Sequence, residues 1–68
     1  MIVVLETEKT EIRDYIDVDS YIANNDLLGL LLDLDATITK VGFDADYNLN
    51  EEGKKLQDIY DEIYYRNK

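Results

Sequence analysis

The start of the chain contains a short apolar run followed by an alternating segment, and both patterns are typical of β-strands. A β-prone run occupies Ile2–Leu5, and residues 10–16 place Ile12 and Ile16 on one face of an extended chain. The polar residues 7–10 have a composition and length that suit a hairpin loop. The pattern therefore predicts two antiparallel strands joined by a turn.

The same segment also fits a helix, and this alternative stays open. Ile12, Tyr15 and Ile16 have the spacing of one helix face, and Thr7 is a suitable cap for a helix over residues 8–16. We favour the hairpin over this helix.

The middle of the chain contains its most apolar segment. Residues 17–20 are typical of a helix entry, with Asp19 or Ser20 as the cap of a short first turn, and residues 24–26 offer a second cap. The leucines that follow cover most of a helix circumference and are Leu27, Leu28, Leu30, Leu31, Leu32 and Leu34. We expect this helix to form the centre of the core or to bury one face against a second subunit.

The segment Ala36–Phe43 predicts a third strand. Its β-branched and aromatic residues alternate, so that Thr37, Thr39, Val41 and Phe43 share one face. An acidic connection over residues 44–48 follows this strand.

The last part of the chain predicts an amphipathic helix. Asn50 is a suitable N-cap, and Glu51 and Glu52 fall in the first turn, where the helix dipole favours negative charge. Arg66 and Lys68 match the dipole at the other end. The apolar face has helical spacing and consists of Leu56, Ile59, Tyr60, Ile63 and Tyr64.

Together these elements predict an α+β fold in a single domain over residues 1–68. We expect a small antiparallel sheet of two or three strands packed with two helices, in the order β-β-α-β-α. A chain of 68 residues buries only about 60% of its unfolded surface, so it depends on good packing or on self-association.

Composition excludes several functional classes. The chain has no cysteine and no histidine, so it lacks thiolate ligands, the usual zinc ligand and the commonest general base. Hydrophobic residues make up 46%, which argues against a disordered acidic tail. No apolar run has the length of a membrane span and no basic leader is present, so we expect a cytoplasmic protein with no cofactor, no metal and no membrane partner.

Negative charge is concentrated in the middle of the chain. Between residues 14 and 53 the only base is Lys40, and this stretch carries the whole formal charge of −9. Such a surface repels nucleic acid and anionic membranes and attracts basic partners. The predicted partner-binding carboxylates are Asp14, Asp17, Asp19, Asp26, Asp33, Asp35, Asp44, Asp46, Glu51 and Glu52.

One short motif suggests an enzyme. Asp33 and Asp35, followed by Thr37 after an apolar run, resemble the first motif of the haloacid dehalogenase phosphatases. The resemblance implies Asp33 as nucleophile, Asp35 as general acid and a Mg²⁺ ion held by both. That family needs a doubly wound parallel sheet with further acidic and lysine residues on later strands, and too few residues follow the motif. We therefore expect no enzymatic activity.

A second motif suggests calcium binding. Asp44, Asp46, Asn48 and Asn50 alternate like the oxygen ligands of an EF-hand loop. The sixth position is leucine where glycine is required, and the twelfth is lysine where a glutamate is required. An acidic turn before a capped helix explains the same residues, so weak divalent binding is the most that the motif predicts.

Aromatic and leucine side chains suggest a contact surface. The chain contains six tyrosines, and tyrosine is enriched at interfaces. The predicted interface of a possible homodimer comprises Leu27, Leu31, Leu34, Tyr60 and Tyr64.

In size, composition and aspartate content the chain resembles the small acidic host-takeover proteins of bacteriophages, several of which are DNA mimics. The resemblance implies a non-enzymatic inhibitor that does not bind nucleic acid directly and occupies the basic DNA-binding surface of a host protein. Expected targets are an HU-type nucleoid protein, RNA polymerase or a defence nuclease. The alternative is a small interaction module that binds through its leucine or tyrosine surface, with incidental acidity.

Overall fold

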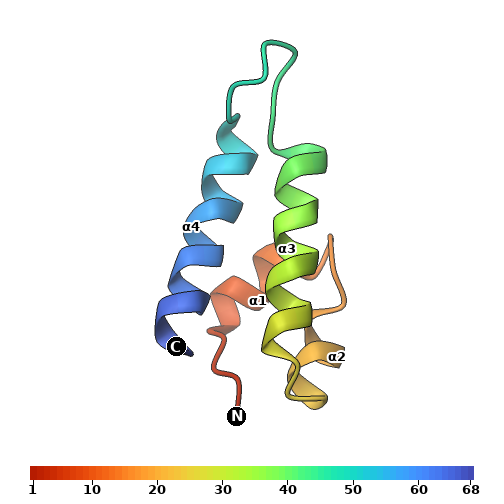
Figure 1. Ribbon diagram of the computed structural model, residues 1–68, viewed down its shortest axis with the longest axis vertical. Coiled ribbons are helices and arrows are strands. Elements are labelled where there is room, and N and C mark those ends of the chain that lie inside the picture. The colour runs from red at the N-terminus through yellow and green to blue at the C-terminus, as the bar shows by residue number, and fades with distance from the viewer.

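A computed structural model describes residues 1–68 and contains four helices and no sheet (Figure 1). Helices account for 65% of the residues. The predicted α+β class is therefore wrong, and the protein is all-α. The helices are α1 (Glu6–Ile12), α2 (Val18–Ala23), α3 (Leu27–Val41) and α4 (Glu51–Arg66).

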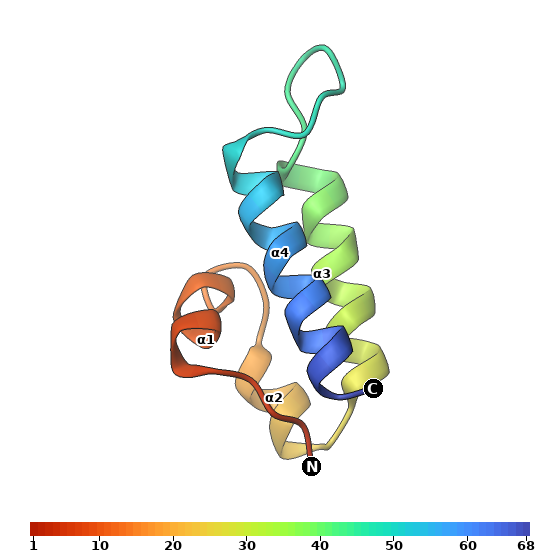
Figure 2. The same ribbon diagram turned by 90° about the vertical axis from the view of Figure 1, so that its left-hand side faces the viewer.

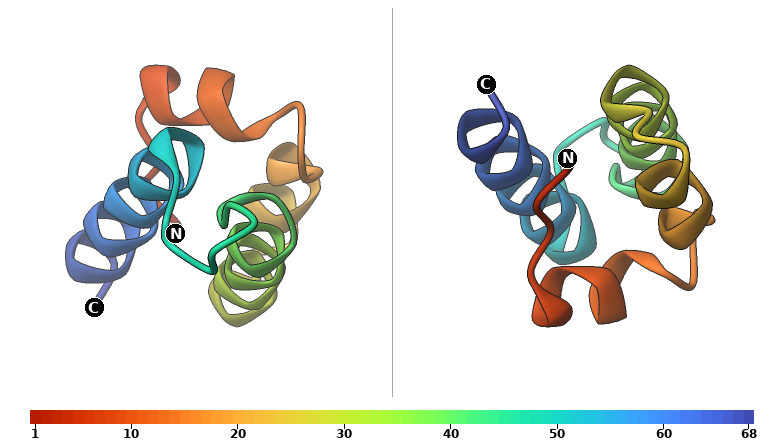
Figure 3. Two further views of the ribbon diagram at one scale, coloured as in Figure 1. Left: turned by 90° about the horizontal axis from the view of Figure 1, so that it is seen from above. Right: turned by 90° about the horizontal axis from the view of Figure 1, so that it is seen from below.

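The two long helices, α3 and α4, lie antiparallel and are joined by a loop at one end of the molecule (Figure 1). The short helices α1 and α2 pack on the same side of this pair, near its other end (Figures 2 and 3). The molecule measures 38 × 19 × 19 Å. Its single core cluster consists of Ile2, Val4, Ile12, Ile16, Val18, Leu30, Leu31, Leu34, Ile38, Leu56, Ile59 and Ile63.

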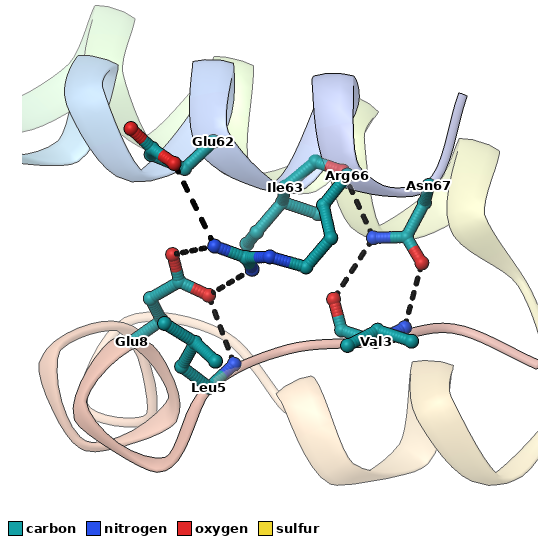
Figure 4. A network of polar contacts seen from close by, with 7 residues as sticks. All are labelled: Val3, Leu5, Glu8, Glu62, Ile63, Arg66 and Asn67. Atoms are coloured by element: carbon teal, nitrogen blue, oxygen red, sulfur yellow. Dashed lines mark hydrogen bonds and ion pairs between the residues drawn. The ribbon is translucent and has the colours of Figure 1, made fainter.

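The first predicted strand, Ile2–Leu5, is extended but pairs with no other strand. Burial nonetheless alternates along this segment as it would in a strand, because Ile2 and Val4 are buried whereas Val3 and Leu5 are exposed. The side chain of Asn67 takes the place of a neighbouring strand. The Val3 N–H donates to Asn67 Oδ1 at 2.6 Å, and Asn67 Nδ2 donates to the Val3 carbonyl at 2.9 Å (Figure 4).

The second predicted strand is also wrong, and the helical alternative for this segment is correct in kind. Helix α1 ends at Ile12, and residues 13–16 continue as a turn rather than as helix. The cap is not Thr7: α1 begins after Leu5, whose N–H donates to the Glu8 carboxylate at 2.9 Å. Ile12 and Ile16 reach the same core from this helix and turn.

The third predicted strand is wrong because α3 continues to Val41. Ile38 continues the buried face of α3, which includes Leu34, into this segment. Burial on that face outweighs the β-propensity of residues 36–43. The hydroxyls of Thr37 and Thr39 donate to the carbonyls of Asp33 and Asp35 at 2.9 and 3.1 Å, so both threonines are accommodated within the helix.

The prediction of the last helix is confirmed. Asn50 caps α4 by accepting a hydrogen bond from the Gly53 N–H at 2.7 Å. Gly53 lies against Gly42, and a Cβ atom at Gly53 would collide with the Gly42 carbonyl oxygen, so the two helices meet closely here. Tyr64 departs from the prediction because it is 43% exposed.

The predicted start of α3 is right in position, whereas α2 begins earlier than predicted, at Val18. Asp26 caps α3 by accepting a hydrogen bond from the Gly29 N–H at 2.9 Å. The cap of α2 is Asp17, which accepts from the Ser20 N–H, rather than Asp19 or Ser20 itself. The physical reason is that the side chain must reach an amide two or three residues further along, and only Asp17 precedes the turn by that distance.

A partly buried ion pair joins α1 to the end of α4. Arg66 Nη1 and Nη2 donate to the two carboxylate oxygens of Glu8 at 2.6 and 3.1 Å (Figure 4). Glu62 lies 3.6 Å from the same guanidinium. Together with the Asn67 contacts, this pair anchors the N-terminal segment to the last turn of α4.

Candidate functional site: an acidic surface

The ion pairs leave the middle of the chain uncompensated. Only one of the ten predicted carboxylates forms an ion pair, that of Asp19 with Arg13 at 3.2 Å. Lys40, the only base of that region, has no carboxylate within 4.0 Å. The other ion pairs join residues outside the region, namely Lys9–Glu6, Lys55–Glu11, Arg66–Glu8 and Arg66–Glu62.

The segments that carry the ten carboxylates are distributed along the long axis of the molecule, from α2 through α3 to the loop before α4 (Figure 1). Those of residues 17–26 lie around α2 and the start of α3, at one end. Asp33 and Asp35 lie within α3, and Asp44 and Asp46 lie in the loop at the opposite end. Eight of the ten are exposed, and Asp33 and Glu52 are partly buried.

Three of the carboxylates gather around two tyrosines on one side of α3. Asp14 and Asp33 line the same surface groove, together with Tyr15 and Lys40. The Tyr21 hydroxyl donates to Asp33 at 2.7 Å. The Tyr15 hydroxyl donates to Glu52 at 2.5 Å, which brings the start of α4 to this side of the molecule.

These contacts change the acidity of both phenols. The hydrogen bond to Glu52, then burial and the charges of Glu52, Asp14 and Glu11 raise the pKa of Tyr15. The hydrogen bond to Asp33, then burial and the charges of Asp33, Asp26 and Asp17 raise the pKa of Tyr21. In both cases ionisation of the phenol would place a new negative charge beside carboxylates.

The ten carboxylates do not share one face. Asp35 lies two residues after Asp33, which is about 200° around a helix of 3.6 residues per turn. Asp35 therefore points away from the groove that contains Asp33. The same geometry bears on the phosphatase motif, because two carboxylates on nearly opposite sides of α3 cannot converge on one Mg²⁺ ion.

Several of the carboxylates have local structural roles. Asp17 and Asp26 are helix caps. Asp44 Oδ1 accepts hydrogen bonds from the Asp46 and Asn48 N–H groups at 2.9 and 3.0 Å and so organises the loop. No group of three or more acidic side chains is arranged to hold a metal ion, in this loop or elsewhere. The side chains that accept no hydrogen bond and form no ion pair are those of Asp14, Asp35, Asp46 and Glu51.

The predicted dimer interface needs correction. Leu31 is 7% exposed and Leu34 is fully buried, because both pack in the core of this chain. Leu27 and Tyr60 are partly buried against the same core, and only Tyr64 is exposed. The exposed leucines of α3 are instead Leu28 and Leu32.

Sequence reasoning missed an acidic group on α4. Asp58, Asp61 and Glu62 line one surface hollow together with Tyr65. Their spacing of three to four residues places them on one helix face and could have identified them. The net charge of the C-terminal residues does not reveal these acids, because the lysine and arginine residues nearby offset their negative charge.

Comparison of the chain with protein-family models, with curated proteins and with solved structures found no match. None of the four helices combines the length and the apolar character that crossing a membrane requires.

Proposed function

We propose that this chain is a non-enzymatic acidic binding protein that occupies the basic DNA-binding surface of a host protein and inhibits it, in the manner of a bacteriophage DNA mimic. Candidate partners are an HU-type nucleoid protein, RNA polymerase or a defence nuclease in the bacterial cytoplasm. The observation that carries the proposal is the placement of the ion pairs. Apart from Arg13, which pairs with Asp19, the bases pair with carboxylates outside residues 14–53 or lie unpaired, so nine of the ten carboxylates in that region have no ion-pair partner.

The dimensions support this proposal. The long axis of 38 Å is close to one turn of B-DNA, about 34–36 Å. At one charge per about 1.7 Å, that length of duplex carries roughly 22 phosphates. The ten carboxylates amount to about half of them, and because they are distributed over more than one face, any one face presents a smaller share. The electrostatic field is weaker than that of DNA. Because charge attraction drives the encounter, we expect a fast and salt-sensitive association.

The test is capture of partners on the immobilised protein from a bacterial lysate, with elution by salt and, in parallel, by duplex DNA. We expect a basic DNA-binding protein to elute under both conditions, because salt screens the carboxylates and duplex DNA competes for the same basic surface. Retention of a protein that resists salt and ignores DNA would contradict the proposal.

The exposure of Leu28 and Leu32 favours a second candidate, an interaction module whose acidity is incidental. Two leucines that are 69% and 61% exposed on adjacent turns form an apolar patch. Such a module would bind with little dependence on salt and without competition from DNA.

A further inference from the structure

The outer side of α3 carries an apolar stripe that no other helix covers. Leu28 and Leu32 are 69% and 61% exposed, and Ala36 is exposed one turn further on. Their spacing of four residues places them along one side of the helix. The opposite side packs into the core through Leu30 and Leu34. We call Leu28, Leu32 and Ala36 the α3 stripe.

Carboxylates flank the α3 stripe on both sides. Relative to Leu32, Asp33 lies about 100° around the helix in one direction and Asp35 about 60° in the other. Asp26 lies at the start of the helix. Lys40, the only base on α3, lies one turn beyond Ala36 on the Asp33 side, so it ends the stripe with a positive charge. Beside Leu28 and Leu32 the stripe therefore lies between the carboxylates of Asp33 and Asp35.

This charge pattern argues for one kind of occupant. A second copy of this chain carries the same charge of −9 and the same acidic margins, so like charges would face one another. A helix with apolar residues on one face and lysine or arginine beside them is complementary both to the stripe and to its margins.

We propose that the α3 stripe docks a basic amphipathic helix of the protein that the acidic surface captures. This inference rests on the proposed function and adds the contact that gives it selectivity. The carboxylates attract any basic surface, whereas Leu28 and Leu32 stabilise only a complex in which the partner places apolar side chains on them. The apolar part of the binding resists salt, because burial of leucine does not depend on screening.

The experiment uses two synthetic peptides of equal length and equal positive charge. In the first, leucine and lysine are arranged as an amphipathic helix, and in the second, serine replaces every leucine. Binding of each fluorescently labelled peptide is measured by anisotropy at low and at high salt. The test variant is Leu28→Gln with Leu32→Gln. The matched control is Tyr47→Gln with Tyr65→Gln, which removes two exposed side chains outside α3 without changing the charge. Circular dichroism establishes that both variants keep the helical fold.

We expect the wild-type protein to bind the leucine peptide about tenfold or more tightly than the serine peptide, with the difference retained at high salt. The stripe variant should lose this difference and the control should keep it. If the stripe variant keeps the difference, the inference is overturned.

The remaining outcomes separate the inference from the proposed function. Equal, salt-sensitive binding of both peptides overturns the inference and leaves the acidic binding role standing. Failure to bind either peptide overturns both. Sedimentation that shows a wild-type dimer and a monomeric stripe variant overturns the inference in favour of a second copy as the occupant.

Discussion

At the scale of single residues, Glu8 has the most distinctive environment. Its side chain is 9% exposed and accepts hydrogen bonds from Arg66 and from the Leu5 N–H. Burial by itself raises the pKa of Glu8, but the hydrogen bonds of Arg66 and Leu5 and the charge of Arg66 outweigh it, so the pKa lies below its ordinary value of 4.5. The folded state therefore favours the ionised carboxylate and is stabilised by it.

Glu8→Gln should lower the free energy of unfolding at neutral pH by about 2 kcal/mol, because Arg66 loses its buried, charged partner. Since the folded pKa is lowered, the wild-type advantage should be full above pH 4.5 and should disappear as pH falls through the folded pKa. Urea unfolding at several pH values gives the free energy of unfolding of both proteins. Subtracting one from the other at each pH removes the contribution of the titrating groups that both proteins contain.

Glu6→Gln is the control for this experiment. The Glu6 side chain is 84% exposed and pairs only with Lys9, so its removal should change stability little at any pH. An advantage of wild type over Glu8→Gln that persists at acid pH would contradict the assigned role of the ion pair.

At the scale of helices, α4 was predictable and the end of α3 was not. In α4 the cap Asn50 and the spacing of Leu56, Ile59 and Ile63 both indicate a helix, so the local sequence is sufficient to predict it. In residues 36–43 the β-branched residues favoured a strand. The segment is helical because Ile38 continues the buried face of α3. The sequence of residues 36–43 alone does not reveal that face.

The assignment of residues 36–41 to α3 can be tested by two alanine variants. Ile38 is 4% exposed, so Ile38→Ala should lower the free energy of unfolding by about 2–5 kcal/mol through the cavity that it leaves. Thr39 is exposed, and Thr39→Ala should raise stability by a few tenths of a kcal/mol, because alanine is the better helix former. Thermal unfolding followed by circular dichroism gives both values. A larger loss from Thr39→Ala than from Ile38→Ala would contradict a helix here.

At the scale of the whole molecule, the charge distribution is the dominant feature. Self-repulsion among like charges destabilises a compact state, and this chain keeps most of its central carboxylates unpaired. The ion pairs that do form hold the helices together at the flanks, where α1 meets α4 through Glu8–Arg66 and Glu11–Lys55. The ion pairs that join α1 to α4 thus use carboxylates outside the proposed binding set, whereas Asp17, Asp26 and Asp44 of that set also have structural roles.

Neutralising the central carboxylates should weaken binding to the captured partner. We expect the combined change of Asp33, Asp35, Asp44 and Asp46 to asparagine to reduce affinity by roughly tenfold or more, and to reduce its salt dependence. The matched control changes Glu6, Asp58, Asp61 and Glu62 to their amides. This control removes the same charge from exposed positions outside residues 14–53.

Affinity is measured for both proteins by titration at several salt concentrations. The control should lose clearly less affinity than the central variant. Equal losses would mean that total charge, and not its position, determines binding.

The sequence by itself determined α4 with its cap Asn50, the start of α3 after a cap within residues 24–26, and the excess of negative charge between residues 14 and 53. These are properties of neighbouring residues, and neighbours are known from the sequence. Only the tertiary structure decided that Asp33 and Asp35 face different sides and that Leu34 is buried while Leu28 is exposed. It also decided that Asn67 takes the place of a strand beside Val3. Such outcomes depend on how distant segments pack, because burial and ion pairing are set by the partner that each side chain meets.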